Sequence, residues 1–92
     1  MNLMWRITKD LVEPEAGMAE SVRYNKKYAG TMRKFRMYDD DGELMYEGEG
    51  NCLDHEHGYG FEPLDDFGMP NAGCTEIHWH NPEKGEDVWE LL

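Results

Sequence analysis

The chain has 92 residues, enough for one domain with a modest core, and carries 20 Asp+Glu against 9 Lys+Arg, a formal net charge of −11. This charge disfavours direct binding to nucleic acid or to anionic lipid, and no apolar run approaches the roughly 20 residues that span a bilayer. A hydrophobic content of 39%, with three Trp, five Tyr and three Phe, is too high for a disordered chain. We therefore expect residues 1–92 to form a single cytoplasmic domain with no membrane partner and no direct nucleic-acid partner.

Charge is divided by position. Residues 1–36 carry eight basic and four acidic side chains, whereas residues 37–92 carry one basic and sixteen acidic side chains. If the acidic part folds as a contiguous face, its field attracts basic partners. This pattern favours a binding protein, and we expect no enzymatic activity because no catalytic motif is present.

The first element we expect is a half-buried strand over residues 3–11, where Trp5 and Ile7 alternate with polar neighbours. Residues 18–32 follow as a basic segment without a clean apolar period. This segment either holds a short helix near residues 16–24 or is a flexible arm.

A β-hairpin is predicted over residues 34–47, because alternating residues flank the sequence Asp-Asp-Asp-Gly at 39–42. A two-residue loop at Asp41-Gly42 would place Met37 opposite Tyr46 and Arg36 opposite Glu47, and a four-residue loop would keep the same faces inward. Residues 48–60 contain many glycines and are expected to form a loop.

A second hairpin is predicted over residues 75–91, with the turn at residues 81–86. Ile77 and Trp79 should face the core, while His78 and His80 should face outward. The predicted fold is mainly β, a single small domain of about five antiparallel strands in a sheet or partly open barrel, with at most one short helix.

Between the hairpins, residues 61–73 are rich in Pro, Gly and Asn and are predicted to form a rigid Ω-type loop. Asp65 and Asp66 should cap turns there, since Asp side chains bond nearby backbone N–H groups. Four apolar side chains should pack this loop onto the core: Phe61, Leu64, Phe67 and Met69.

Two blocks carry a resemblance: Asp-Asp-Asp-Gly-Glu-x-x-Tyr-Glu-Gly at residues 39–48, and Pro-Leu-Asp-Asp-Phe-Gly-Met-Pro-Asn-Ala-Gly-Cys-Thr-Glu-Ile at residues 63–77. The chain resembles a group of small uncharacterised bacterial and bacteriophage proteins that share these blocks and a C-terminal strand containing Trp. The likeness covers residues 33–91 and, more weakly, 5–9. It implies an identity for the chain but no activity, cofactor or catalytic residue.

Every Cys and His of the chain falls within residues 52–80: Cys52, His55, His57, Cys74, His78 and His80. Thiolate and imidazole are the preferred ligands of Zn²⁺, so these six residues are candidate metal ligands. The spacing Cys-x-x-x-His at residues 74–78 does not complete a standard zinc finger, and the alternative is two free thiols with surface histidines and no cofactor.

Acidic side chains form the candidate partner-binding site: Asp39, Asp40, Asp41, Glu43, Glu47, Glu49, Glu62, Asp65 and Asp66. The carboxylates of residues 39–43 suggest Ca²⁺, but the segment lacks the twelve-residue loop and terminal Glu of an EF-hand. We expect a protein-binding module that engages a protein with a basic surface. In its narrowest form this module imitates the phosphates of nucleic acid and inhibits a nucleic-acid-binding partner, as phage inhibitors do. The alternative is a metal- or small-ligand-binding module built on the Cys/His cluster.

Overall fold

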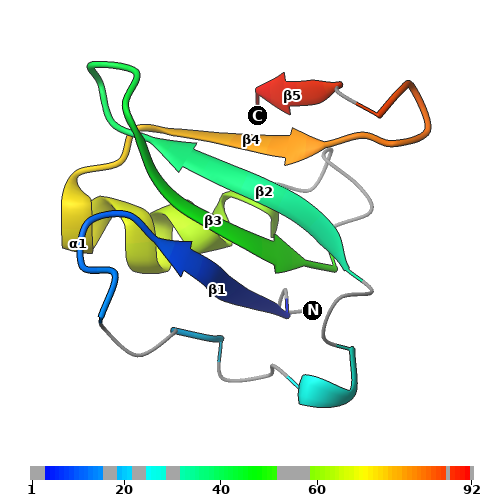
Figure 1. Cartoon of the computed structure of the whole chain (residues 1–92), viewed down its shortest axis with the longest axis horizontal. Coiled ribbons are helices and arrows are strands. Elements are labelled where there is room, and N and C mark those ends of the chain that lie inside the picture. Colours follow the sequence, from blue (N-terminus) through cyan, green and yellow to red (C-terminus); the bar gives the residue numbers. More distant parts are fainter. Residues whose placement is uncertain are drawn as a thin grey trace.

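Five antiparallel strands form one open sheet in the computed structural model, which describes residues 4–15, 19–21, 25–28, 32–51, 59–86 and 88–91. The strands are β1 (Trp5–Asp10), β2 (Arg33–Tyr38), β3 (Leu44–Gly50), β4 (Glu76–His80) and β5 (Trp89–Leu91). Their order is β1-β3-β2-β4-β5, so β1 and β5 form the two edges (Figure 1). The predicted mainly β fold is confirmed, and the sheet does not close into a barrel.

The first predicted hairpin is formed by β2 and β3. Met37 lies opposite Tyr46 and Arg36 opposite Glu47, as the alternation indicated. The loop is longer than two residues, because the amide of Gly42 donates to the carbonyl of Asp39 and the amide of Asp39 donates to the carbonyl of Glu43. Within this loop only Gly42 has a positive φ, at 79°, as expected for a type I turn followed by a left-handed glycine.

The second predicted hairpin is formed by β4 and β5, joined by a turn in which the amide of Lys84 donates to the carbonyl of Asn81. Ile77 and Trp79 are fully buried, and His78 and His80 lie on the opposite face of β4. Both predicted orientations are confirmed. They follow from the two-residue period of a strand, which sends alternate side chains to opposite faces.

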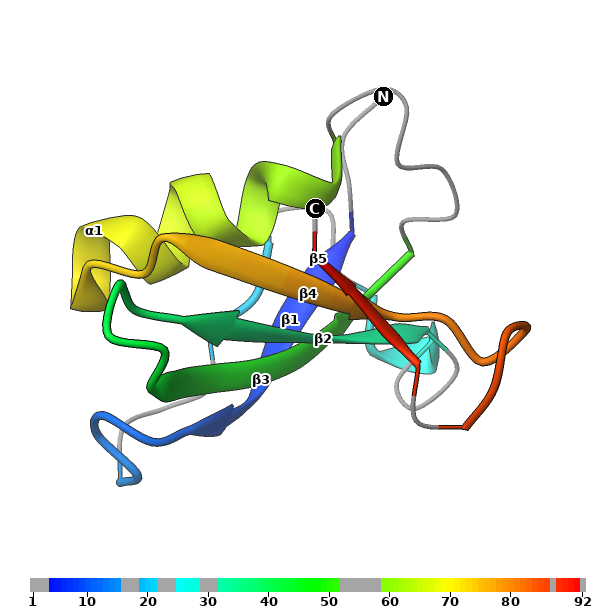
Figure 2. The same cartoon turned by 90° about the horizontal axis from the view of Figure 1, so that it is seen from above.

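Helical turns replace the predicted Ω-type loop. They are η3 (Tyr59–Phe61), the π-helical turn η4 (Leu64–Gly68) and α1 (Met69–Ala72), and they cover one face of the sheet (Figure 2). Pro63 is the N-cap of η4 and Pro70 lies in the first turn of α1, positions where no amide is needed, and Gly73 at φ 66° ends α1. The prolines and glycines that suggested a loop therefore begin and end short helices. No described helix is long and apolar enough to cross a membrane.

The basic segment is described only at residues 19–21, 25–28 and 32. Residues 19–21 run extended along the outer edge of β1, where the amide of Ile7 donates to the carbonyl of Ala19 and the amide of Ser21 donates to the carbonyl of Trp5. Of the two alternatives for this segment, the short helix near residues 16–24 is not formed over residues 19–21, and its other residues lie outside the described part. A short 3₁₀ turn, η1 (Lys26–Tyr28), follows.

Aromatic packing over two glycines of β3 forms the centre of the core. Phe35 and Trp79 are fully buried and their ring centroids lie 5.0 Å apart. A Cβ on Gly48 would lie 2.4 Å from the ring of Phe35, and one on Gly50 would lie 2.9 Å from the ring of Trp79. The absence of side chains at these two positions lets both rings lie against the backbone of β3.

The helical segment completes this core. Leu64 is buried, and Phe67 packs against Tyr46 with ring centroids 4.8 Å apart. Phe61 and Met69 are exposed instead, so only two of the four predicted apolar contacts are formed. The indole N–H of Trp79 donates to the carbonyl of Gly60 at 2.9 Å and so ties β4 to the first helical turn.

We predict that Trp79→Ala lowers the free energy of unfolding by about 3 to 5 kcal/mol, because it leaves a large cavity and removes the hydrogen bond to Gly60. Urea denaturation measures this loss. Leu91→Ala, at a residue 61% exposed on β5, is the matched control and should change stability by no more than about 0.5 kcal/mol. A loss below about 1 kcal/mol for Trp79→Ala would contradict the central position of this ring.

Candidate functional site

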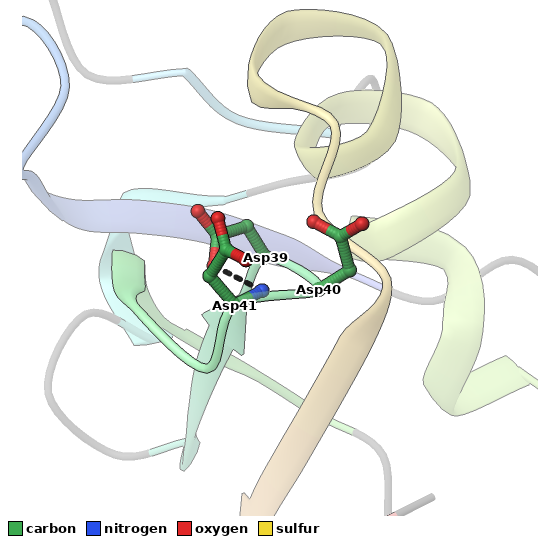
Figure 3. A group of neighbouring side chains, drawn as sticks. All are labelled: Asp39, Asp40 and Asp41. Atoms are coloured by element: carbon green, nitrogen blue, oxygen red, sulfur yellow. Dashed lines mark hydrogen bonds between the residues drawn. The ribbon is translucent and has the colours of Figure 1, made fainter.

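An acidic tip, defined as Asp39, Asp40, Asp41 and Glu43, stands at the turn between β2 and β3. The three aspartates can each place a carboxylate oxygen within 4.8 Å of the others (Figure 3). Asp40, Asp41 and Glu43 are exposed, whereas Asp39 is half-buried. The turn itself explains why Asp39 differs, because its Oδ1 accepts hydrogen bonds from the amides of Asp41 at 3.0 Å and Glu43 at 2.9 Å.

Within the described residues, these three aspartates are the one group of three or more metal-ligand side chains close enough to share an ion. Ca²⁺ takes six to eight oxygen ligands, and three carboxylates on one turn supply too few of them. Asp39 also uses an oxygen for the turn. The side chains of the tip alone therefore leave the coordination shell of a Ca²⁺ ion incomplete.

Glu47 and Glu49 lie apart from the acidic tip. They project from β3 onto the open face, which is the face of the sheet opposite the helical segment. The Nε of Arg36 lies 3.0 Å from a carboxylate oxygen of Glu47, and the Nε of Arg6 lies 2.9 Å from one of Glu49. Glu49 is only 4% exposed. Both acids are consequently neutralised by neighbouring strands.

The other three predicted partner-binding acids belong to the helical segment. Glu62 is half-buried, while Asp65 and Asp66 are exposed in the first turn of η4. The predicted role of this aspartate pair in capping loop turns does not apply, because the residues lie within a helix. The nine predicted acids therefore occupy three separate places: the tip, the open face and the helical segment.

The described members of the Cys/His cluster lie on two sides of the sheet. Cys74 is fully buried and packs against Gly68 of the helical segment, whereas His78 and His80 lie on the open face. Cys52, His55 and His57 lie outside the described residues. The structure thus does not bring Cys74 together with the two described histidines.

The open face carries a groove of about 410 Å³ that is not evident from the sequence pattern. Six of the side chains that line it come from β2, β3, β4, β5 and the turn between β4 and β5: Lys34, Arg36, Glu47, His80, Glu86 and Trp89. In the sequence, charged residues alternate along both strands at positions 34, 36, 47 and 49, and this pattern indicates a charged face. Their convergence with Trp89 depends on the strand order, which places β5 beside β4 and β4 beside β2.

Aromatic and hydrogen-bond contacts fix the groove side chains. The guanidinium of Arg36 lies over the ring of Trp89 at 4.1 Å from its centroid, and the ring of His80 lies 4.9 Å from the same indole. His80 Nε2 lies 2.7 Å from the carbonyl oxygen of Glu86. Because a carbonyl only accepts, Nε2 carries a proton, and Nδ1 of the neutral ring is left as an acceptor.

Comparisons of the chain with protein-family models, with curated proteins and with solved structures gave no match. The geometry of the acidic tip and of the groove is therefore the basis for assigning a function.

We predict that Asp39→Ala lowers the free energy of unfolding by about 1 kcal/mol, because two turn amides lose their acceptor. Asp41→Ala removes an exposed carboxylate from the same turn and should change stability by no more than about 0.5 kcal/mol. Urea denaturation of both variants provides the comparison. Equal losses would show that the carboxylate of Asp39 does not hold the turn.

Cys74 gives a prediction about pH. Burial raises the pKa of its thiol from 9.0 to about 11, and the nearby negative charge of Asp39 adds to the shift. Between pH 9 and pH 11 the unfolded chain therefore loses a proton that the folded chain keeps, so the free energy of unfolding should fall as pH rises through this window. Burial also raises the pKa of Tyr46 above 10.0, which extends the fall at its alkaline end.

The measurement is urea denaturation of the wild type and of Cys74→Ala at intervals from pH 8 to pH 11. The variant should lose less stability than the wild type between pH 9 and pH 10, where the thiol contributes more than Tyr46. Parallel curves for the two proteins would contradict a buried, neutral Cys74 thiol.

Proposed function

We propose that this chain is a small cytoplasmic protein-binding module that uses its acidic tip to bind a basic surface on another protein. The observation that carries the proposal is the convergence of the three aspartates, whose carboxylates gather within 4.8 Å on an exposed turn. Among the described residues, no basic side chain forms an ion pair with any of them. Like charges held this close repel, and cationic groups of a partner would relieve that repulsion.

The distribution of charged residues along the sheet supports the same proposal. The register places Asp10 opposite Tyr46 and Glu76 opposite Tyr38, so both acids lie at the end of the sheet that carries the tip. Arg6 and Arg33 lie toward the opposite end, each within reach of a glutamate. The tip, Asp10 and Glu76 thereby gather acidic side chains at one end of the sheet, which can orient an approaching basic protein.

In its narrowest form, the proposal makes the tip an imitation of nucleic-acid phosphates that blocks a nucleic-acid-binding protein. The support is the net charge of −11 together with adjacent carboxylates on a firm turn. The alternative, a metal- or small-ligand module built on the Cys/His cluster, is less well supported because Cys74 is buried on the face away from His78 and His80.

The experiment compares two double variants in affinity capture from lysate of the source cell. Asp40→Asn with Asp41→Asn removes two exposed charges from the tip and spares Asp39, which holds the turn. Asp65→Asn with Asp66→Asn removes the same charge from the helical segment and is the matched control. Proteins are eluted with rising salt and identified by mass spectrometry.

We expect a basic protein that the wild type and the control retain and that the tip variant loses. Its elution should require only moderate salt, because exposed charge pairs are screened over about 10 Å at 0.1 M. Equal retention by both variants, or loss only with the helical variant, would reject the tip as the binding site.

A further inference from the structure

The groove on the open face is a second candidate binding surface, independent of the acidic tip. Lys34 lies five residues before Asp39 on β2, a distance of about 17 Å along an extended strand. This exceeds the screening length of about 10 Å at 0.1 M salt, so the tip has little influence on the charge of Lys34. The volume of about 410 Å³ lies within the range of small-molecule sites.

The negative groups on the floor of the groove already have partners. Glu47 is paired with Arg36, and Glu49 is paired with Arg6 from the neighbouring strand. A cationic ligand would therefore have to displace a guanidinium that is already in place. These two carboxylates consequently offer little to a positively charged ligand.

The basic side chains of the groove can still donate hydrogen bonds to a ligand. The ammonium of Lys34 is exposed, and no described acid forms an ion pair with it. Arg36 uses its Nε for Glu47, while a guanidinium has five N–H donors in all. Lys34 and Arg36 are two residues apart on one strand, so their side chains leave the same face about 7 Å apart.

Arg36 is also held in place before any ligand arrives. The ring of Trp89 lies against its guanidinium, and the carboxylate of Glu47 fixes its Nε. A positioned guanidinium loses little freedom on binding and matches the two oxygens of a carboxylate or phosphate. His80 lines the same groove, where its Nε2 is held at the carbonyl of Glu86.

We propose that this groove binds a small organic molecule through an oxyanion group, a carboxylate or a phosphate, held between Lys34 and Arg36. Of the three acids that line the groove, Glu47 and Glu49 are paired with arginines, which leaves the charge of Glu86 to oppose such a ligand. Glu86 is exposed at the rim, and no ion pair is formed by its carboxylate within the described residues. Removing the charge of Glu86 should therefore strengthen binding of the anion, whereas removing the charge of Lys34 should weaken it.

The probes are benzoate and phenyl phosphate, which carry the two oxyanions on the same ring, and benzylamine as the cation of similar shape. Binding is followed by two-dimensional ¹H–¹⁵N NMR, with the Trp89 indole as the reporter in the groove. We expect saturable shifts at Trp89 and at the amides of Lys34 and Arg36 with one or both anions and none with benzylamine. The anion that binds more tightly identifies the headgroup.

Lys34→Gln should weaken binding of that anion by about 5- to 10-fold, and Glu86→Gln should strengthen it by about 2- to 5-fold. Lys26→Gln changes the net charge as Lys34→Gln does, but at an exposed residue outside the groove, and should alter affinity by less than about 2-fold. All three substitutions are at exposed positions, and the spectrum of each variant verifies its fold.

Three results would overturn the proposal: no saturable shift with either anion, saturable binding of benzylamine instead, or equal weakening by Lys34→Gln and Lys26→Gln. The last result would show that the anion responds to net charge and not to the groove. None of these results bears on the acidic tip, because none of the three substitutions lies there.

Discussion

The close approach of Phe35 and Trp79 to the backbone of β3 is the contact on which the rest of the structure depends. Gly48 and Gly50 leave room for these rings, and a Cβ at Gly48 would meet both the Phe35 ring and the carbonyl of Arg6 at 2.4 Å. One face of the sheet is thereby fixed as the core side. Since strand side chains alternate, the neighbours of these residues must occupy the other face, and the charged groups there are a direct consequence of the packing.

The proposed functions depend on how charged side chains are distributed over the open face and the first hairpin. Arg6 and Arg36 pair with Glu49 and Glu47 of β3, so these two acids add little to the exposed negative charge. The turn between β2 and β3 has no such neutralisation among the described residues, and its negative charge faces outward at one end of the sheet. The proposed protein-binding tip and the proposed oxyanion groove are thus two sites on the same sheet, separated along the direction of its strands.

The strands, the hairpin register and the inward faces of Ile77 and Trp79 could be predicted because each depends on local alternation and turn residues. The helical segment over residues 59–72 could not, because its prolines and glycines have the same local pattern in a loop and in short helices. The ion pairs that Glu47 and Glu49 form with arginines could not be predicted as a set, because they depend on β1 and β2 lying on the two sides of β3. The groove likewise required knowledge that β5 brings Trp89 beside His80.

The measurement that tests the account most directly is a ¹H–¹⁵N NMR titration of the whole chain with tetra-arginine, mapped onto the described residues. The account predicts saturable shifts at the amides of Asp40, Asp41 and Glu43 that disappear in high salt, with smaller changes at Asp65 and Asp66. Shifts spread evenly over all exposed acids, or centred on the helical segment, would contradict the proposal that the acidic tip is the site that binds a basic partner.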